Sequence, residues 1–177
     1  ASRAEALGRL SWGHGGVRVA RGDAFRVEME KGSGISCLYL NPPYDLDRVH
    51  GRLEQRFLCR FAPMLAMGGY LVFVVPHYAL AASAEYLARE FDKVSCFRFP
   101  PGDFDVFKQV VLVARKAETF ATSRADVERS VRGWSADVSS CEDLPEANAP
   151  VERALVLPTS RQQAIDTWNM RPVDVAH

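Results

Sequence analysis

The sequence carries no net charge, because 22 lysine and arginine residues balance 22 aspartate and glutamate residues. Nucleic-acid-binding domains are usually basic, so a polyanionic substrate would have to meet a local basic patch. The four cysteines lie far apart, with no C-x-x-C pair and no histidine at ligand spacing. This pattern argues against a zinc site and against a disulfide framework, and predicts buried free thiols and no metal site.

Long hydrophobic runs are also missing. No run approaches the roughly 20 apolar residues that cross a bilayer, and the first residues lack the apolar centre of a signal peptide. These absences predict a soluble, cytoplasmic protein without a membrane partner. A length of 177 residues is enough for one buried core and an appendage, and too short for two large domains.

What the sequence does have is an alternation of β-prone runs and helical patterns. The β-prone runs are residues 17–20, 35–40, 70–75, 94–99 and 109–114, and the helical patterns are residues 2–10, 46–61 and 80–91. The Pro-Pro-Gly-Asp stretch at 100–103, between the last two β-prone runs, predicts a turn. This order predicts an α/β fold with a mainly parallel sheet, helices on both faces and an antiparallel last strand.

The composition turns polar after residue 116. We therefore divide the chain into a core domain, residues 1–116, and a polar C-terminal appendage, residues 117–177. The appendage would dock on the core or on a partner, or support self-association.

The tetrapeptide that follows the β-prone run at 35–40 is Asn41-Pro42-Pro43-Tyr44, named the NPPY loop below. Open α/β sheets bind ligands at the carboxyl ends of their strands. There the Asn41 side-chain oxygen and the Pro42 carbonyl can each accept one N–H of a planar amino group, which leaves the nitrogen lone pair free to attack. The prolines fix the backbone, and Tyr44 offers a face for base stacking. The alternative is an ordinary proline-rich turn.

Together with its flanking elements, the NPPY loop resembles the catalytic loop of class I S-adenosylmethionine-dependent methyltransferases. The resemblance is to the amino-methyltransferase branch, which includes DNA adenine-N6 methyltransferases, and it covers residues 17–116. It implies a Rossmann-like fold, S-adenosylmethionine as the cofactor, and Asn41, Pro42, Pro43 and Tyr44 as the catalytic residues.

The resemblance also implies a cofactor contact at Asp23, Ala24 and Phe25, which have the form of the family's acidic segment near the cofactor's adenine. Its glycine-rich loop after the first strand has no counterpart, because the glycines at 13, 15 and 16 follow a helical pattern and precede a strand. We therefore expect a Rossmann-like fold truncated at its N-terminus, which would bind cofactor weakly or not at all.

Two features suggest how a substrate would bind. The resemblance places an aromatic residue, Phe104 or Phe107, against the target base, with packing inside a hairpin as the alternative. Arginines also repeat every four residues along the predicted helix at 46–61, at positions 48, 52, 56 and 60. Arg52 and Arg56 would contact nucleic-acid phosphates, unless the stripe is a solvated helix face.

These observations predict an S-adenosylmethionine-dependent N-methyltransferase that acts on an exocyclic amino group, adenine N6 in DNA. Guanine in RNA and glutamine in protein present the same planar group and stay as alternatives. A third alternative is a non-catalytic methyltransferase-like module that binds nucleic acid or a partner.

Overall fold

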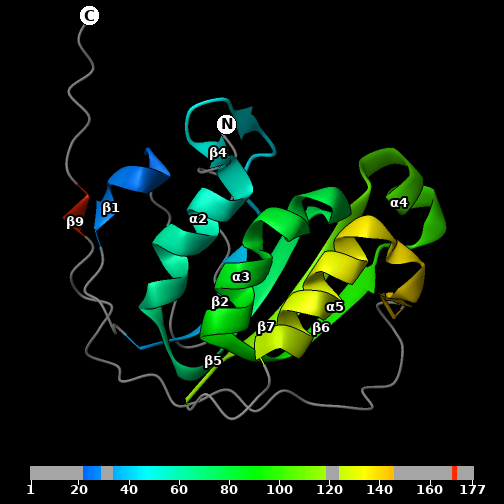
Figure 1. Cartoon of the computed structure of the whole chain (residues 1–177). Coiled ribbons are helices and arrows are strands. Elements are labelled where there is room, and N and C mark those ends of the chain that lie inside the picture. Colours follow the sequence, from blue (N-terminus) through cyan, green and yellow to red (C-terminus); the bar gives the residue numbers. More distant parts are fainter. Residues whose placement is uncertain (1–21, 29–33, 119–123, 146–168, 171–177) are drawn as a thin grey trace, which may run out of the picture. The chain divides into compact units, whose positions relative to one another are not determined.

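The computed structural model of the chain describes residues 22–28, 34–118, 124–145 and 169–170, in two compact units (Figure 1). The smaller unit comprises residues 1–29 and 167–177. It contains the 3-10 helix η2 (Ala24–Arg26) and strand β1 (Val27–Glu28), which pairs antiparallel with β9 (Asn169–Met170). The helix and strand predicted at 2–10 and 17–20, with the glycines between them, lie outside the described residues.

The larger unit is built on a five-stranded sheet with the order β2-β5-β7-β6-β8. Its strands are β2 (Ile35–Leu40), β5 (Leu65–Pro76), β6 (Phe91–Arg98), β7 (Gln109–Lys116) and β8 (Glu142–Asp143). Strand β2 runs parallel to β5, and β6 runs parallel to β8, whereas β7 runs antiparallel to both of its neighbours. The predicted Rossmann-like α/β fold is confirmed, and so is the antiparallel last pair.

Three helices pack side by side on one face of this sheet: α2 (Leu53–Phe61), α3 (Leu80–Glu90) and α5 (Arg124–Ala136) (Figure 1). Side chains alternate between the faces of a strand, so every second residue of the central strands β5 and β7 points toward these helices. The fully buried members of this set are Leu71, Phe73, Val75, Val110, Leu112 and Ala114. They form one apolar core with Leu58, Leu80, Leu87 and Val131 of the helices.

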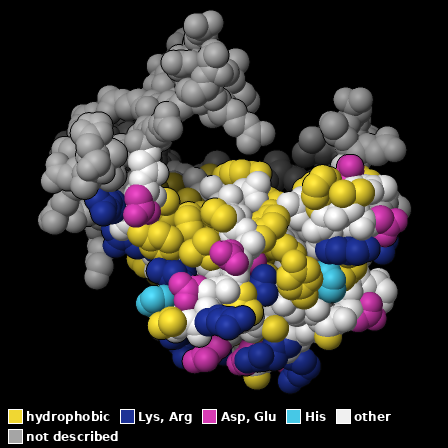
Figure 2. All heavy atoms as spheres, turned by 90° about the horizontal axis from the view of Figure 1, so that it is seen from above, with side chains coloured by type: hydrophobic (Ala, Val, Ile, Leu, Met, Phe, Trp, Pro, Cys, Tyr) yellow, Lys and Arg dark blue, Asp and Glu magenta, His cyan; other side chains and the backbone are white. Residues whose placement is uncertain are grey.

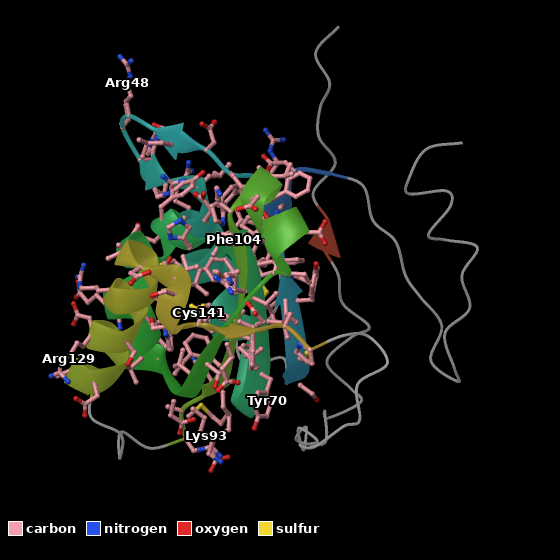
Figure 3. The ribbon with its side chains drawn as sticks, turned by 90° about the vertical axis from the view of Figure 1, so that its right-hand side faces the viewer. Arg48, Tyr70, Lys93, Phe104, Arg129 and Cys141 are labelled. Atoms are coloured by element: carbon pink, nitrogen blue, oxygen red, sulfur yellow. The ribbon has the colours of Figure 1, made fainter. Side chains whose placement is uncertain are left out.

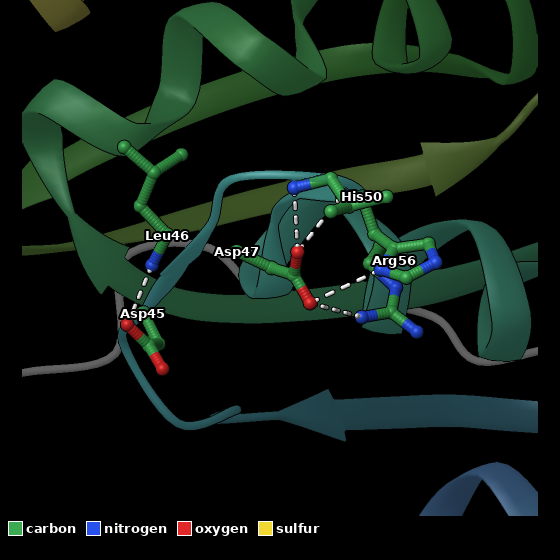
Figure 4. Close-up of polar contacts among 6 residues, drawn as sticks. Asp45, Leu46, Asp47, His50 and Arg56 are labelled. Carbon is green, nitrogen blue, oxygen red and sulfur yellow. Dashed lines mark hydrogen bonds and ion pairs between the residues drawn. The ribbon is translucent and has the colours of Figure 1, made fainter.

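The predicted helix over 46–61 is wrong in its first half. Residues 46–52 form a hairpin of β3 (Leu46–Asp47) and β4 (Gly51–Arg52), and α2 begins only at Leu53. The Asp47 carboxylate accepts the backbone N–H groups of Val49 (2.7 Å) and His50 (3.0 Å), which closes a turn (Figure 4). Gly51 has a φ of 77°, a left-handed conformation that a helix cannot contain. The four arginines therefore form no continuous stripe.

The turn predicted at 100–103 is instead the start of helix α4 (Pro101–Phe107). Proline is favoured at the first position of a helix because it lacks only an N–H that would have no helical partner there, and Asp103 lies in the favourable first turn. The helix ends at Lys108, which adopts a left-handed φ of 52°. Phe104 and Phe107 are therefore helical residues.

Short 3-10 helices complete the larger unit. Pro63 lies in η3 (Ala62–Met64), which follows α2 directly, so the predicted end of that helix is confirmed. Strand β5 continues into η4 (His77–Ala79), and α5 is followed by η5 (Val138–Ser140). Within the described residues, no helix is long and apolar enough to cross a bilayer.

Part of the predicted appendage packs on the sheet. Val127 and Val131 of α5 and Val138 of η5 are buried in the same core as the strands, and β8 pairs with β6. Residues 124–145 therefore extend the core of the larger unit. The division of the chain at residue 116 stays a prediction.

Candidate active site

Three strand ends meet at the edge of the sheet where the NPPY loop begins. Strands β2 and β5 are parallel, with Leu40 opposite Phe73, so their carboxyl ends lie at the same edge. Strand β7 is antiparallel and starts there, with Gln109 opposite Pro76. The loop after β2, helix η4 after β5 and the first residue of β7 therefore lie together, at the edge where sheets of this class bind ligands.

Hydrogen bonds join three side chains at this edge into a group named the Asn41 network: Asn41, Tyr44 and Gln109. Gln109 donates from Nε2 to the Tyr44 hydroxyl, and that hydroxyl donates to Asn41 Oδ1 over 2.8 Å. A carbonyl oxygen has two lone pairs, so Asn41 Oδ1 keeps one for a substrate N–H. Pro42 is buried beside it and Pro43 is exposed. No local sequence pattern points to Gln109, which is 65 residues from Tyr44.

The surroundings of Tyr44 keep its hydroxyl protonated. The side chain is 37% exposed, and partial burial raises its pKa because the charged phenolate is less well solvated there. The N–H from Gln109 opposes this shift, whereas the Glu54 carboxylate and the phenols of Tyr39 and Tyr78 raise the pKa further. At neutral pH Tyr44 is therefore a hydrogen-bond donor toward Asn41.

Arg52 and Glu54 form an ion pair next to this network, between Arg52 Nη2 and Glu54 Oε1 at 2.8 Å. The Glu54 side chain has no exposed surface, and the Arg52 side chain is 21% exposed. The Arg52 guanidinium also lies over the Tyr78 ring, 5.1 Å from its centroid. Arg52 is thus engaged by the protein itself, and its phosphate contact stays a prediction.

Two other arginines of the predicted stripe have surroundings that differ from those of Arg52. Arg56 Nη1 lies 3.9 Å from Asp47 Oδ2, and His50 Nδ1 lies 3.1 Å from the same oxygen (Figure 4). The backbone N–H of Val49, followed by the side chain and N–H of His50, lowers the pKa of Asp47 to about 2. Arg48 points outward from the turn of the hairpin (Figure 3).

The two phenylalanines of α4 differ in exposure. Phe104 is half-buried, with its ring centroid 5.9 Å from that of His77 and 5.1 Å from Lys108 Nζ. Phe107 is 59% exposed. Phe107 is the more exposed of the two and so the better placed for a base contact, which stays a prediction.

Several large hydrophobic side chains are exposed around the NPPY loop. Seen from above, hydrophobic side chains gather in a band across this end of the molecule (Figure 2). The exposed large hydrophobic residues in the NPPY loop, the β3–β4 hairpin, η4 and α4 are Tyr44, Leu46, Val49, Tyr78, Val106 and Phe107. Apolar and aromatic surface of this kind suits a flat, weakly charged ligand group.

The predicted cofactor contacts lie in the smaller unit. Asp23 Oδ1 accepts the Phe25 backbone N–H over 3.0 Å, and Asp23 Oδ2 lies 3.7 Å from Arg26 Nε. The Asp23 side chain is 51% exposed, and Ala24 and Phe25 are half-buried. The role of these three residues at a cofactor stays a prediction.

The cysteines are free thiols, two of them exposed (Cys37 and Cys59) and two buried (Cys96 and Cys141). The expectation of buried thiols is therefore wrong for the first two. Partial removal from water raises the pKa of the Cys37 thiol, and burial raises that of Cys96 more strongly. In the part of the chain that the structure describes, no group of three or more His, Cys, Asp or Glu side chains could hold a metal ion.

The chain matches the model of a known protein family. The model of the Uncharacterised methyltransferase family (DUF6094) matches residues 4–149. That segment contains the NPPY loop and continues through α5 and β8. No curated protein matches the chain, and no solved structure does.

Proposed function

The chain belongs to this methyltransferase family, and we propose that it transfers a methyl group from S-adenosylmethionine to an exocyclic amino nitrogen, that of adenine N6 in DNA. The observation that carries the proposal is the hydrogen bond from the Tyr44 hydroxyl to Asn41 Oδ1, at the carboxyl end of β2. It presents a fixed acceptor oxygen, next to the proline-held carbonyl of Pro42, at the edge where a ligand would enter.

This arrangement answers the main difficulty of the reaction. An aromatic amine is a poor nucleophile because its lone pair is delocalised into the ring. When Asn41 Oδ1 and the Pro42 carbonyl each accept one N–H, the nitrogen becomes more tetrahedral and its lone pair points away from them. Positioning of this kind accelerates methyl transfer without the help of a strong base.

S-adenosylmethionine, when bound, supplies a methyl group on a positively charged sulfur. The amine lone pair forms the new N–C bond while the S–C bond breaks and leaves its electron pair on sulfur. The nitrogen now carries the positive charge, and it loses a proton to water. Asn41 Oδ1 and the Pro42 carbonyl stabilise this charge, because their bonds to the N–H groups strengthen as it develops.

The chemistry of Asp23, Ala24 and Phe25 fits the adenine end of the cofactor. The Asp23 carboxylate is half exposed, and only one of its oxygens accepts the Phe25 N–H. Ionised carboxylates have about four lone-pair sites, so the group can also accept an adenine amino N–H. The Phe25 ring would add an apolar contact.

A second candidate substrate is a glutamine side chain of a protein, which also presents a planar amino group. This candidate is favoured because the cations near the site already form ion pairs with carboxylates of the protein. Arg52 pairs with Glu54, Arg56 with Asp47 and Lys108 with Asp105. Phosphate contacts would have to compete with these carboxylates, whereas a neutral amide needs none.

The test is methyl transfer from labelled S-adenosylmethionine to DNA, RNA and protein in parallel, with the Asn41→Ala variant as control. We expect label in DNA as N6-methyladenine, and a rate about 100-fold or more lower with the variant. Label on protein alone would overturn the DNA assignment and support the second candidate. Cofactor binding by calorimetry without label on any of the three polymers would contradict the proposed activity.

A further inference from the structure

We propose that Gln109 is a positioning residue of this active site, which acts through the Tyr44 hydroxyl to fix both the Tyr44 ring and the acceptor oxygen of Asn41. The inference rests on the proposed function, since it concerns the same amine-binding loop. Gln109 lies outside the NPPY loop and comes from a strand at the far end of the domain sequence.

The backbone of Gln109 is held firmly. It is the first residue of β7, which lies between β5 and β6 and pairs with both. Gln109 itself is opposite Pro76, and the carbonyl of the preceding residue, Lys108, accepts the His77 N–H over 2.9 Å. A side chain on a central strand is a more rigid support than one on a loop.

The direction of the hydrogen bonds decides what Asn41 presents. A hydroxyl has one proton, and when its oxygen accepts from Gln109 Nε2, that proton is free to donate to Asn41. The donated proton requires the oxygen of the Asn41 amide, not its NH₂ group, at this position. Because an amide can turn over, the Asn41 network selects the orientation that accepts a substrate N–H.

The same contacts orient the Tyr44 ring. Its hydroxyl is bonded at two points, to Asn41 and to Gln109, so rotation of the half-exposed side chain is restricted. A ring that is held before the base arrives loses less conformational entropy on stacking. Gln109 thereby positions the Tyr44 ring and the Asn41 oxygen, which would contact the substrate, although Gln109 itself would not.

The kinetic test uses Gln109→Met, which keeps the size of the side chain and removes its N–H donors. Tyr44→Phe is the partner variant, because it keeps the ring and removes the hydroxyl. We expect each to lower kcat about 10-fold, the factor that one ordinary hydrogen bond corresponds to, with KM nearly unchanged. The double variant should lose about 10-fold and not about 100-fold, because both changes break one network.

A matched control is Arg115→Met, which introduces the same residue near the other end of β7. It should leave kcat unchanged. If Gln109→Met leaves kcat unchanged, or if its loss multiplies fully with that of Tyr44→Phe, the proposal is overturned.

A second readout does not depend on activity. The N–H from Gln109 lowers the pKa of Tyr44, against the opposing effects of burial, Glu54, Tyr39 and Tyr78. Gln109→Met should therefore raise the Tyr44 pKa, measured by NMR titration of tyrosines labelled with ¹³C and assigned with Tyr44→Phe.

The two readouts separate the two proposals. A raised Tyr44 pKa with unchanged kcat would overturn the positioning role and leave the proposed function intact. An unchanged Tyr44 pKa would show that the bond is absent in solution, and would overturn the positioning role even if no substrate were found. Failure of the wild-type chain to methylate DNA, RNA or protein, although it binds S-adenosylmethionine, would instead contradict the proposed function.

Discussion

Two arginine–carboxylate pairs lie at opposite ends of the same sheet, and they differ in how fully their atoms are hydrogen-bonded. At the end where β7 finishes, Arg115 donates from Nε and Nη2 to the two oxygens of Asp92, over 2.8 and 2.7 Å. At the NPPY end, Arg52 donates to one oxygen of Glu54 only. Within the described residues, Arg52 Nε and Glu54 Oε2 are buried without a hydrogen-bond partner.

The neighbours of the two pairs differ in the same way. Beside Arg115, Lys116 pairs with Glu90 over 2.7 Å, so the end where β7 finishes carries two charge pairs with short contacts. Beside Arg52 lie the exposed aromatic and aliphatic side chains around the NPPY loop. Unpaired buried groups and exposed apolar surface both cost free energy, and native proteins tolerate such costs mainly at functional sites. These features support the proposal that the active site lies at the NPPY end, whereas the charge pairs at the other end stabilise the fold.

The largest expected effect on stability comes from Arg52→Met. It leaves the fully buried Glu54 carboxylate without its cation, which should lower the free energy of unfolding by about 3–5 kcal/mol at neutral pH. Urea unfolding measures the loss. The double variant Arg52→Met with Glu54→Leu should recover most of it, and a loss of less than about 1 kcal/mol for the single variant would show that the pair is not buried in solution.

Arg115→Met, at the other end, should cost less. The Arg115 and Asp92 side chains are 26% and 10% exposed, so water can partly solvate the carboxylate that remains. We expect a loss of about 1–3 kcal/mol in the free energy of unfolding, with no change in kcat. A fall in kcat of the fully folded Arg115→Met variant would show that this end of the sheet also contributes to activity.

Phe107→Ser should weaken substrate binding and leave the stability of the fold nearly unchanged. The ring is 59% exposed, so the free energy of unfolding should stay within about 0.5 kcal/mol of the wild type. If the ring contacts a base, KM should rise about 10-fold, in line with the strength of base stacking. Val106→Ser, at a neighbouring position that is 70% exposed, is the matched control. Equal KM values for Phe107→Ser and the wild type would remove Phe107 from the substrate site.

The smallest expected effect is on the pH dependence of the β3–β4 hairpin. The pKa of Asp47 is lowered to about 2, so its contribution to stability is fully present above its unfolded pKa of about 3.9 and is lost as the pH falls toward 2. NMR titration of the Asp47 carboxyl carbon measures this directly. Asp47→Asn should remove the pH dependence from the Val49 and His50 amide signals. A midpoint near 3.9 in the wild type would mean that the turn is open in solution.

The sequence predicted the elements whose residues follow one local period. Strand β2 spans the predicted residues 35–40, α3 follows the predicted spacing of apolar residues, and the last two strands pair as expected. Each of these elements buries one face or both in the core, so hydrophobicity alone reveals it.

Elements at the NPPY end were harder to predict because two local signals conflicted. The four-residue spacing of apolar and arginine residues over 46–61 indicated a helix, whereas Asp47 and Gly51 set the turn of a hairpin. In the same way, the Pro-Pro-Gly-Asp stretch indicated a turn, although Pro101 begins a helix. Gln109 could not be found at all, because its contact with Tyr44 forms only when β7 is placed in the sheet.

The most direct test of the central claim compares methyl transfer by the wild type, Asn41→Ala and Arg115→Met, with labelled S-adenosylmethionine and the proposed substrate, DNA. The comparison predicts label on an exocyclic amino nitrogen, a fall of about 100-fold or more with Asn41→Ala, and full activity with Arg115→Met. Equal rates for the wild type and Asn41→Ala, with both proteins folded, would show that the NPPY end of the sheet is not where the methyl group is accepted.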